Sequence, residues 1–162
     1  MGCEYCEIAA GNSKSLILHQ DAEIVVAVKD TSVIPGQITV FPTEHHPIME
    51  LVPDNILQKC SIMANKVSVA IFEGLDTTGT NVIIQNGTAA GQNRPHFAIE
   101  IIPRRENDGL DFQWPQKQLT EDELGYLFNE LTEEVPEEKP AIKPKKVSGK
   151  DNYLLKSLKR KA

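Results

Sequence analysis

Cysteine is scarce in this chain, and long apolar runs are missing. Only three of the 162 residues are cysteines, an odd number and too few for a disulfide framework. No apolar run approaches the roughly 18 residues that a membrane-spanning helix needs, and the first residues lack the basic and apolar regions of a signal peptide. We therefore expect a cytoplasmic protein without a membrane partner.

Positive charge is rare outside one end of the chain. Nine of the 17 Lys and Arg residues, but only three of the 23 Asp and Glu residues, lie in segment 136–162. The acidic remainder is not expected to bind nucleic acids generically, because phosphate affinity depends on Lys and Arg. Proline and lysine become frequent after Val135. We therefore predict a domain over 1–135 and a basic linker and tail over 136–162.

The apolar patterns predict strands and helices in alternation. Strands are expected at 23–29, 37–41, 81–85 and 97–102. Apolar residues at spacings of three or four predict a helix from about 53 to 74. Thr120 and Glu123 form a capping-box pattern, which predicts a second helix over about 121–134. Short connections between these segments favour an α+β fold with an antiparallel sheet.

Two cysteines near the start of the chain have the spacing of metal ligands. Zinc prefers four nitrogen or sulfur ligands, so Cys3 and Cys6 need two more. The sequence offers four histidines as candidates: His19, His45, His46 and His96. A redox pair, or cysteines and histidines with no common function, remain alternatives at this point.

A glycine-containing turn between two predicted strands is a candidate binding loop. Asn86–Gly87 and Gly91–Gln92 would expose backbone N–H groups to an anionic ligand, although a plain hairpin loop has the same composition. In the strand that follows, His96, Ala98 and Glu100 are expected to share one face.

The segment 86–104 resembles the signature of the histidine triad (HIT) family. In that family the turn is followed by three alternating histidines, two apolar residues and often Pro-Arg. The residues that match are Asn86, Gly87, Ala90, Gly91, Gln92, His96, Ile101, Ile102, Pro103 and Arg104. Segments 28–36 and 41–45 and the pair Cys3 and Cys6 extend the resemblance. It implies a meandering antiparallel sheet with a long helix and a C-terminal helix, a homodimer, and a purine nucleotide or nucleotide-like anion as ligand.

The resemblance also implies site residues. A structural zinc ion would be held by Cys3, Cys6, His45 and His96. The ribose hydroxyls would be held by Asp30. The ribose-phosphate region would be lined by Gln85, Asn86, Gly87, Gly91 and Gln92, with Gln92 near the α-phosphate. His19 and His46 would then lie on the surface, and Cys60 in the core.

The triad itself departs from the family pattern. In active members the second histidine is the nucleophile that forms a nucleotidyl-histidine intermediate. That position is Ala98 here, the third is Glu100, and the histidine often found after the Pro-Gly turn is Gln37.

Three functions remain open for such a chain. The first is nucleotide binding without the usual hydrolase or transferase activity. The second is a phosphoester or phosphoramidate hydrolase with altered chemistry, in which Glu100 acts as base or nucleophile. The third is a zinc-stabilised interaction module.

Overall fold

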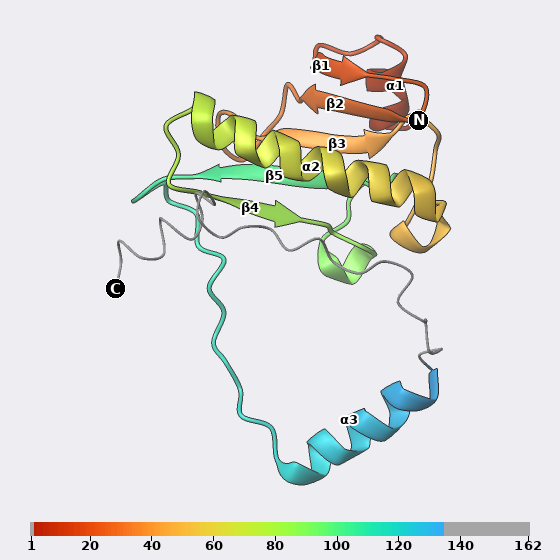
Figure 1. Ribbon diagram of the computed structural model, residues 1–162, viewed down its shortest axis with the longest axis vertical. Coiled ribbons are helices and arrows are strands. Elements are labelled where there is room, and N and C mark those ends of the chain that lie inside the picture. The colour runs from red at the N-terminus through yellow and green to blue at the C-terminus, as the bar shows by residue number, and fades with distance from the viewer. Residues whose placement is uncertain (1, 135–162) are drawn as a thin grey trace, which may run out of the picture. The chain divides into compact units, whose positions relative to one another are not determined.

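Figure 1 shows the computed structural model of the chain, which describes residues 2–134. The chain divides into two compact units, Met1–Asp108 and Gly109–Ala162. The predicted basic tail over 136–162 lies outside the described residues, so the predicted division of the chain at 135 stays a prediction.

The first unit is built on one five-stranded sheet. Its strands are β1 (Leu16–Gln20), β2 (Ile24–Val28), β3 (Ile38–Pro42), β4 (Gly79–Ile83) and β5 (Ile99–Arg104). They lie in the order β1-β2-β3-β5-β4, and every neighbouring pair is antiparallel. The predicted α+β fold with an antiparallel sheet is confirmed.

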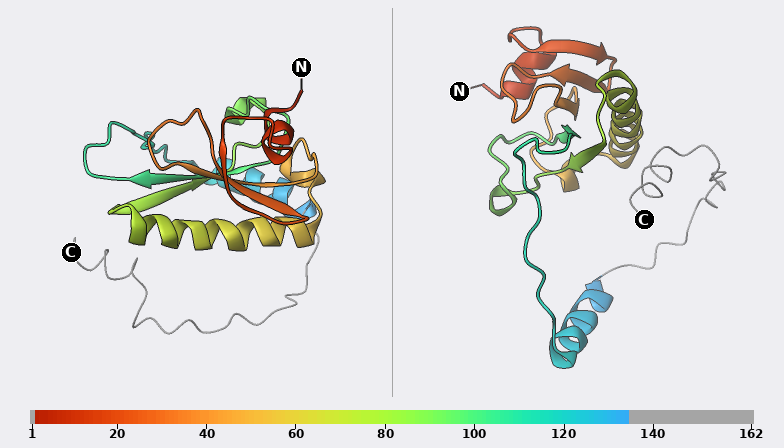
Figure 2. Two further views of the ribbon diagram at one scale, coloured as in Figure 1. Left: turned by 90° about the horizontal axis from the view of Figure 1, so that it is seen from above. Right: turned by 90° about the vertical axis from the view of Figure 1, so that its left-hand side faces the viewer.

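One helix lies against each face of the sheet, as Figure 2 shows in its left view. The long helix α2 (Asp54–Gly74) packs its buried stripe against one face, where Val26 and Val40 lie. The short helix α1 (Glu4–Ala9) packs Tyr5 and Ile8 against the other face. Strand β2 is therefore buried on both sides, and its side chains alternate between two small cores.

The second unit contains α3 (Glu121–Glu134) within the described residues. Its capping box is confirmed, because the Glu123 N–H donates to Thr120 Oγ1 at 3.3 Å and the Thr120 N–H donates to Glu123 Oε2 at 2.8 Å. No helix in residues 2–134 has both the length and the apolar character needed to cross a membrane.

Two elements were not predicted from the sequence, α1 and β1. All five residues of β1 are exposed, so no alternation of apolar and polar residues marks the strand. Helix α1 has six residues, which is too short for a periodic pattern to be recognised. The packing of α1 is nevertheless important for the candidate site, because it brings Cys6, Tyr5 and Glu4 to the sheet.

Candidate metal centre and adjoining cavity

Three separate segments meet at a cluster of sulfur and nitrogen atoms. Cys3 and Cys6 come from the start of α1, His45 from the loop after β3, and His96 from the segment before β5. One potential ligand atom from each of these residues lies within 4.8 Å of the others. Of the six candidates in the sequence, these are the four that the structure brings together.

Three separations between these ligand atoms fit a tetrahedral zinc site. Cys3 Sγ lies 3.4 Å from His96 Nδ1, and Cys6 Sγ lies 3.4 Å from His45 Nδ1 and 3.7 Å from His96 Nδ1. With bonds of about 2.0–2.3 Å, a zinc tetrahedron has edges of about 3.3–3.8 Å. The donor set and its spacing therefore suit a closed zinc site.

The orientation of His96 also favours ligation. Its ring is buried, and its Nε2 lies 3.0 Å from the carbonyl oxygen of Pro42. An Nε2–H that donates there leaves the Nδ1 lone pair facing the two sulfur atoms. Burial lowers the pKa of His96 to about 4, so the ring is neutral at neutral pH, as a ligand must be.

The two remaining histidines lie apart from this cluster. His19 is exposed, with Nε2 3.9 Å from Asp21 Oδ2. His46 was expected on the surface but is partly buried, and its backbone carbonyl accepts a hydrogen bond from Phe97 N–H. Cys60 is fully buried on α2, in the core between helix and sheet.

The glycine turn is closed by its own amide side chains. Gln92 Oε1 accepts the Gly87 N–H at 2.8 Å, and Gln92 Nε2 donates to the Pro47 carbonyl at 2.6 Å. Asn86 Oδ1 accepts the Met49 N–H at 2.9 Å. These contacts fix the loop that carries the predicted nucleotide-binding residues.

Gly87 and Gly91 both have a φ of 87°, a conformation that favours glycine. At Gly91 a Cβ would lie 2.7 Å from the side-chain nitrogen of Gln85. The close approach of Gln85 to this backbone therefore depends on the absence of a side chain at Gly91.

Beneath the turn lies a small cavity next to Ala98. Its volume is about 20 Å³, and it is lined by Tyr5, Gln85, Gln92, Asn93, Arg94, His96, Ala98 and Glu100. The predicted face of the strand is thus confirmed, because His96, Ala98 and Glu100 all border this hollow. The side chains of Phe97, Ile99 and Ile101 point into the core on the other face.

The side-chain oxygens of Glu100 accept hydrogen bonds from three donors. Its Oε2 accepts from Gln37 Nε2 at 2.7 Å and from Thr39 Oγ1 at 2.6 Å, and its Oε1 accepts from the Tyr5 hydroxyl at 3.1 Å. Burial, together with the nearby charge of Glu100, raises the pKa of Tyr5, so this hydroxyl remains a donor. Both Glu100 oxygens are therefore engaged within the protein.

A chain of charges connects Glu100 with the protein surface. Lys29 Nζ lies 3.9 Å from Glu100 Oε1 and 3.6 Å from Glu4 Oε1. Glu4 Oε2 accepts from Arg94 Nε at 2.6 Å. Burial alone would raise the pKa of Glu4, but the Arg94 hydrogen bond and the Lys29 charge outweigh burial and lower it.

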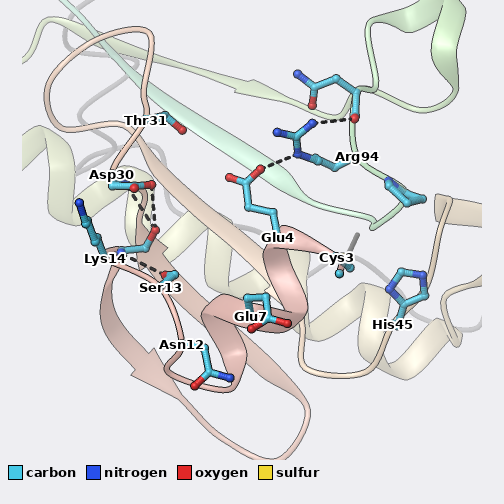
Figure 3. A pocket seen from close by; sticks show the side chains of 14 residues that line it. Cys3, Glu4, Glu7, Asn12, Ser13, Lys14, Asp30, Thr31, His45 and Arg94 are labelled. Atoms are coloured by element: carbon cyan, nitrogen blue, oxygen red, sulfur yellow. Dashed lines mark hydrogen bonds and ion pairs between the residues drawn. The ribbon is translucent and has the colours of Figure 1, made fainter.

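A wide groove of about 970 Å³ opens beside this charge chain. Figure 3 shows Asp30 and Lys14 at one end of it, His45 at the other, and the Glu4–Arg94 pair between them. Asp30 is exposed, and its Oδ1 lies 3.5 Å from Ser15 Oγ. The predicted ribose-binding carboxylate thus faces a groove wide enough for a small ligand.

Four side chains of this polar network were missed in the sequence: Tyr5 and Arg94, which line the cavity, and Glu4 and Lys29, which form ion pairs beside it. Glu4 and Arg94 are 90 positions apart, and no spacing rule joins residues at that distance. The only available signal was the unusual charge of Glu100 within an apolar strand, which requires polar partners when it is half-buried.

Residues 10–107 match the HIT domain family. An adenylylsulfatase of Arabidopsis thaliana is 32% identical over 109 residues, which cover 67% of this chain and 55% of the plant protein. The chain thus spans about half the length of that relative. An adenosine 5'-monophosphoramidase of Candida albicans is 26% identical over 138 residues, 82% of this chain and 91% of the yeast protein.

Solved structures agree with the fold. A HIT family protein from Bacillus subtilis has a TM-score of 0.77 at 23% identity, and the match covers 85% of this chain and all of that one. A zinc-bound histidine triad family protein from Mycobacterium smegmatis has a TM-score of 0.64 at 23% identity, covering 82% and 97%. With a family match over more than half of its length, the chain belongs to the HIT domain family.

Proposed function

We propose that this HIT protein binds a purine nucleotide without cleaving it through a covalent histidine intermediate. One observation carries the proposal. Ala98, at the position of the family's nucleophilic histidine, borders the cavity together with Gln85 and Gln92. A methyl group has no lone pair with which to attack phosphorus.

Nucleotide binding is supported by the retained loop and by the relatives. The names of the plant and yeast proteins refer to adenylyl sulfate and to adenosine 5'-monophosphoramide, both of which contain an adenylyl group. In this chain Asp30 faces the groove, and Gly87, Gly91 and Gln92 form a tight loop next to the cavity. We assign the ribose to Asp30 and the phosphate to the region of the loop.

Catalysis by Glu100 is the less favoured alternative. A carboxylate that attacks phosphorus, or removes a proton from water, needs a free oxygen directed at its target. Both Glu100 oxygens accept hydrogen bonds from Tyr5, Gln37 and Thr39. Their engagement favours a structural role for this carboxylate.

Zinc has a structural role in the proposed function. The ion would be held by Cys3, Cys6, His45 and His96, whose ligand atoms all lie within 4.8 Å of one another. Four protein ligands complete the shell of zinc and leave no position for an activated water. The ion would tie α1 to the loop after β3 and to the start of β5.

We also expect a homodimer, as the family resemblance implies. Strand β4 is one edge of the sheet, and Val82 on it is exposed. Light scattering after size-exclusion chromatography would give about twice the 18.0 kDa chain mass. A monomer at micromolar concentration would contradict the expectation.

The proposed function is tested by separating binding from turnover. Zinc-loaded protein should bind AMP in calorimetry, and Asp30→Ala should weaken binding by about tenfold through loss of a charge-assisted hydrogen bond. Glu106→Ala removes an exposed carboxylate elsewhere and should leave the affinity unchanged.

Turnover of adenosine 5'-phosphoramidate should be lower than that of an active relative by a factor on the order of 10⁴ or more. The Candida albicans enzyme assayed in parallel is the positive control. Wild-type turnover that disappears in Glu100→Gln would contradict the proposal and support the alternative with altered chemistry. Absence of AMP binding would refute the nucleotide assignment itself.

A further inference from the structure

Two cations from distant parts of the chain converge on one carboxylate. Arg94, from the loop before β5, donates Nε–H to Glu4 Oε2 at 2.6 Å. Lys29, directly after β2, holds its Nζ 3.6 Å from Glu4 Oε1. Both oxygens of the Glu4 carboxylate are therefore occupied by positive groups, which is also how proteins bind a phosphate or a carboxylate of a ligand.

The ion pair between Glu4 and Arg94 lies next to the predicted ligand site. Arg94 lines the wide groove beside Asp30, the small cavity next to Ala98 and a third hollow of about 280 Å³ against the glycine turn. Arg94 thus borders the predicted ribose site, the strand position of the nucleophile and the phosphate loop. Figure 3 shows Glu4 pointing toward Arg94 across this junction.

Solvent exposure differs between the two cations and suggests how each would act. The Arg94 side chain is 51% exposed, whereas that of Lys29 is 15% exposed. Lys29 also lies over the Tyr5 ring, 5.1 Å from its centroid. Lys29 is therefore held in place as a fixed positive charge, and Arg94 is free to exchange one anionic partner for another.

We propose that Arg94 and Lys29 bind the phosphoryl group of the ligand, and that Glu4 occupies this site in the free protein as an internal competitor. The proposal rests on the proposed function, because it names the residues that recognise the anionic part of the nucleotide. Ligand binding would exchange the Glu4 carboxylate for a phosphate at the two cations. No bond is formed or broken in this exchange.

Competition of this kind lowers the affinity that the site would otherwise have. A site that is open for only part of the time binds its ligand more weakly by the fraction of time it is open. Removing the Glu4 charge should therefore strengthen phosphate binding. Removing a charged side chain from a binding site usually weakens ligand binding instead. This reversed sign is what distinguishes the proposal.

The test measures AMP, inorganic pyrophosphate and adenosine binding to full-length, zinc-loaded variants by calorimetry. Glu4→Gln should raise the affinity for AMP and pyrophosphate by about tenfold, and Arg94→Gln should lower it by about tenfold. Adenosine has no phosphate, so neither variant should change its affinity by more than about twofold. Arg94→Lys, which keeps the charge but lacks the planar fork, should fall between wild type and Arg94→Gln.

Glu7→Gln is the matched control for Glu4→Gln. It removes the same charge from the same helix, and the described residues form no ion pair between Glu7 and either cation. Its AMP affinity should stay within about twofold of wild type. Zinc content and unfolding temperature are measured for each variant, because Glu4 is next to Cys3 in the chain.

The double variant Glu4→Gln/Arg94→Gln isolates the coupling between the two residues. Glu4→Gln should give no gain when Arg94 is already absent. A gain of the same size in both backgrounds, or an equal gain for adenosine, would overturn the proposal.

If AMP binds and requires Asp30 but Glu4→Gln leaves its affinity unchanged, the internal competitor is refuted and the proposed function stands. If AMP fails to bind to wild type and to every variant, the proposed function has failed with it.

Discussion

Replacing Cys3 with serine is expected to lower bound zinc from roughly one ion per chain to nearly none and to lower the unfolding temperature by more than about 10 °C. The physical reason is that the ion would cross-link three segments that lie far apart along the chain. Cys3 and Cys6 belong to the start of the chain, His45 follows β3 and His96 precedes β5. Plasma emission spectrometry and thermal scans check the two expectations.

The chain contains its own control for this prediction. Cys60 is also a free cysteine, but it is buried on α2 away from the cluster. Cys60→Ala should keep the full zinc content and cost about 1 kcal/mol, as a small core truncation does. Full zinc content in Cys3→Ser, or equal loss in both variants, would contradict the assignment of the site.

Glu100→Ala is expected to destabilise the fold by about 2–4 kcal/mol. The substitution removes the acceptor of the hydrogen bonds that Tyr5, Gln37 and Thr39 donate. It also removes one of the carboxylates that lie near the Lys29 ammonium group. The Glu100 side chain is only 15% exposed, so water replaces the lost acceptor poorly. Urea unfolding followed by circular dichroism measures the loss.

Glu106→Ala is the matched control for Glu100→Ala, because Glu106 is exposed. It should change the free energy of unfolding by less than about 0.5 kcal/mol. Glu100→Gln should recover part of the stability, since its amide oxygen still accepts from some of the donors. If Glu100→Ala is as stable as Glu106→Ala, the carboxylate is not a structural centre, and the catalytic alternative regains support.

The sequence predicted the secondary structure of this protein better than the contacts between its side chains. Strands β2 and β3 and helices α2 and α3 were predicted close to their observed bounds, because burial imposes a local periodicity that a sequence displays. The four candidate metal ligands followed from the HIT resemblance, and the spacing of their ligand atoms agrees with it.

The hydrogen-bond partners of Glu100 at the cavity could not be predicted from local sequence patterns. The partners of Glu100 are Tyr5, Gln37 and Thr39, which lie 61 to 95 positions away in the chain. The contact of Tyr5 with Glu100 depends on the tertiary placement of α1 over the sheet, and α1 is too short to be recognised. The contacts of Gln37 and Thr39 depend on the pairing of β3 with β5. The resemblance predicted the nucleotide-binding residues Asp30, Gln85, Asn86, Gly87, Gly91 and Gln92. Their assignment to a ligand stays a prediction.

Helix α1 would couple the binding of the proposed metal ion to the binding of the proposed ligand. This six-residue helix has no stability of its own, yet it carries Cys6 of the metal cluster, Tyr5 against Glu100 and Glu4 against Arg94. An ion that fixes the position of this helix therefore also fixes the charges that a ligand meets. By reciprocity, a ligand that favours one position of α1 must change the affinity for the metal by the same factor. Metal supply would then regulate how strongly this protein retains its ligand.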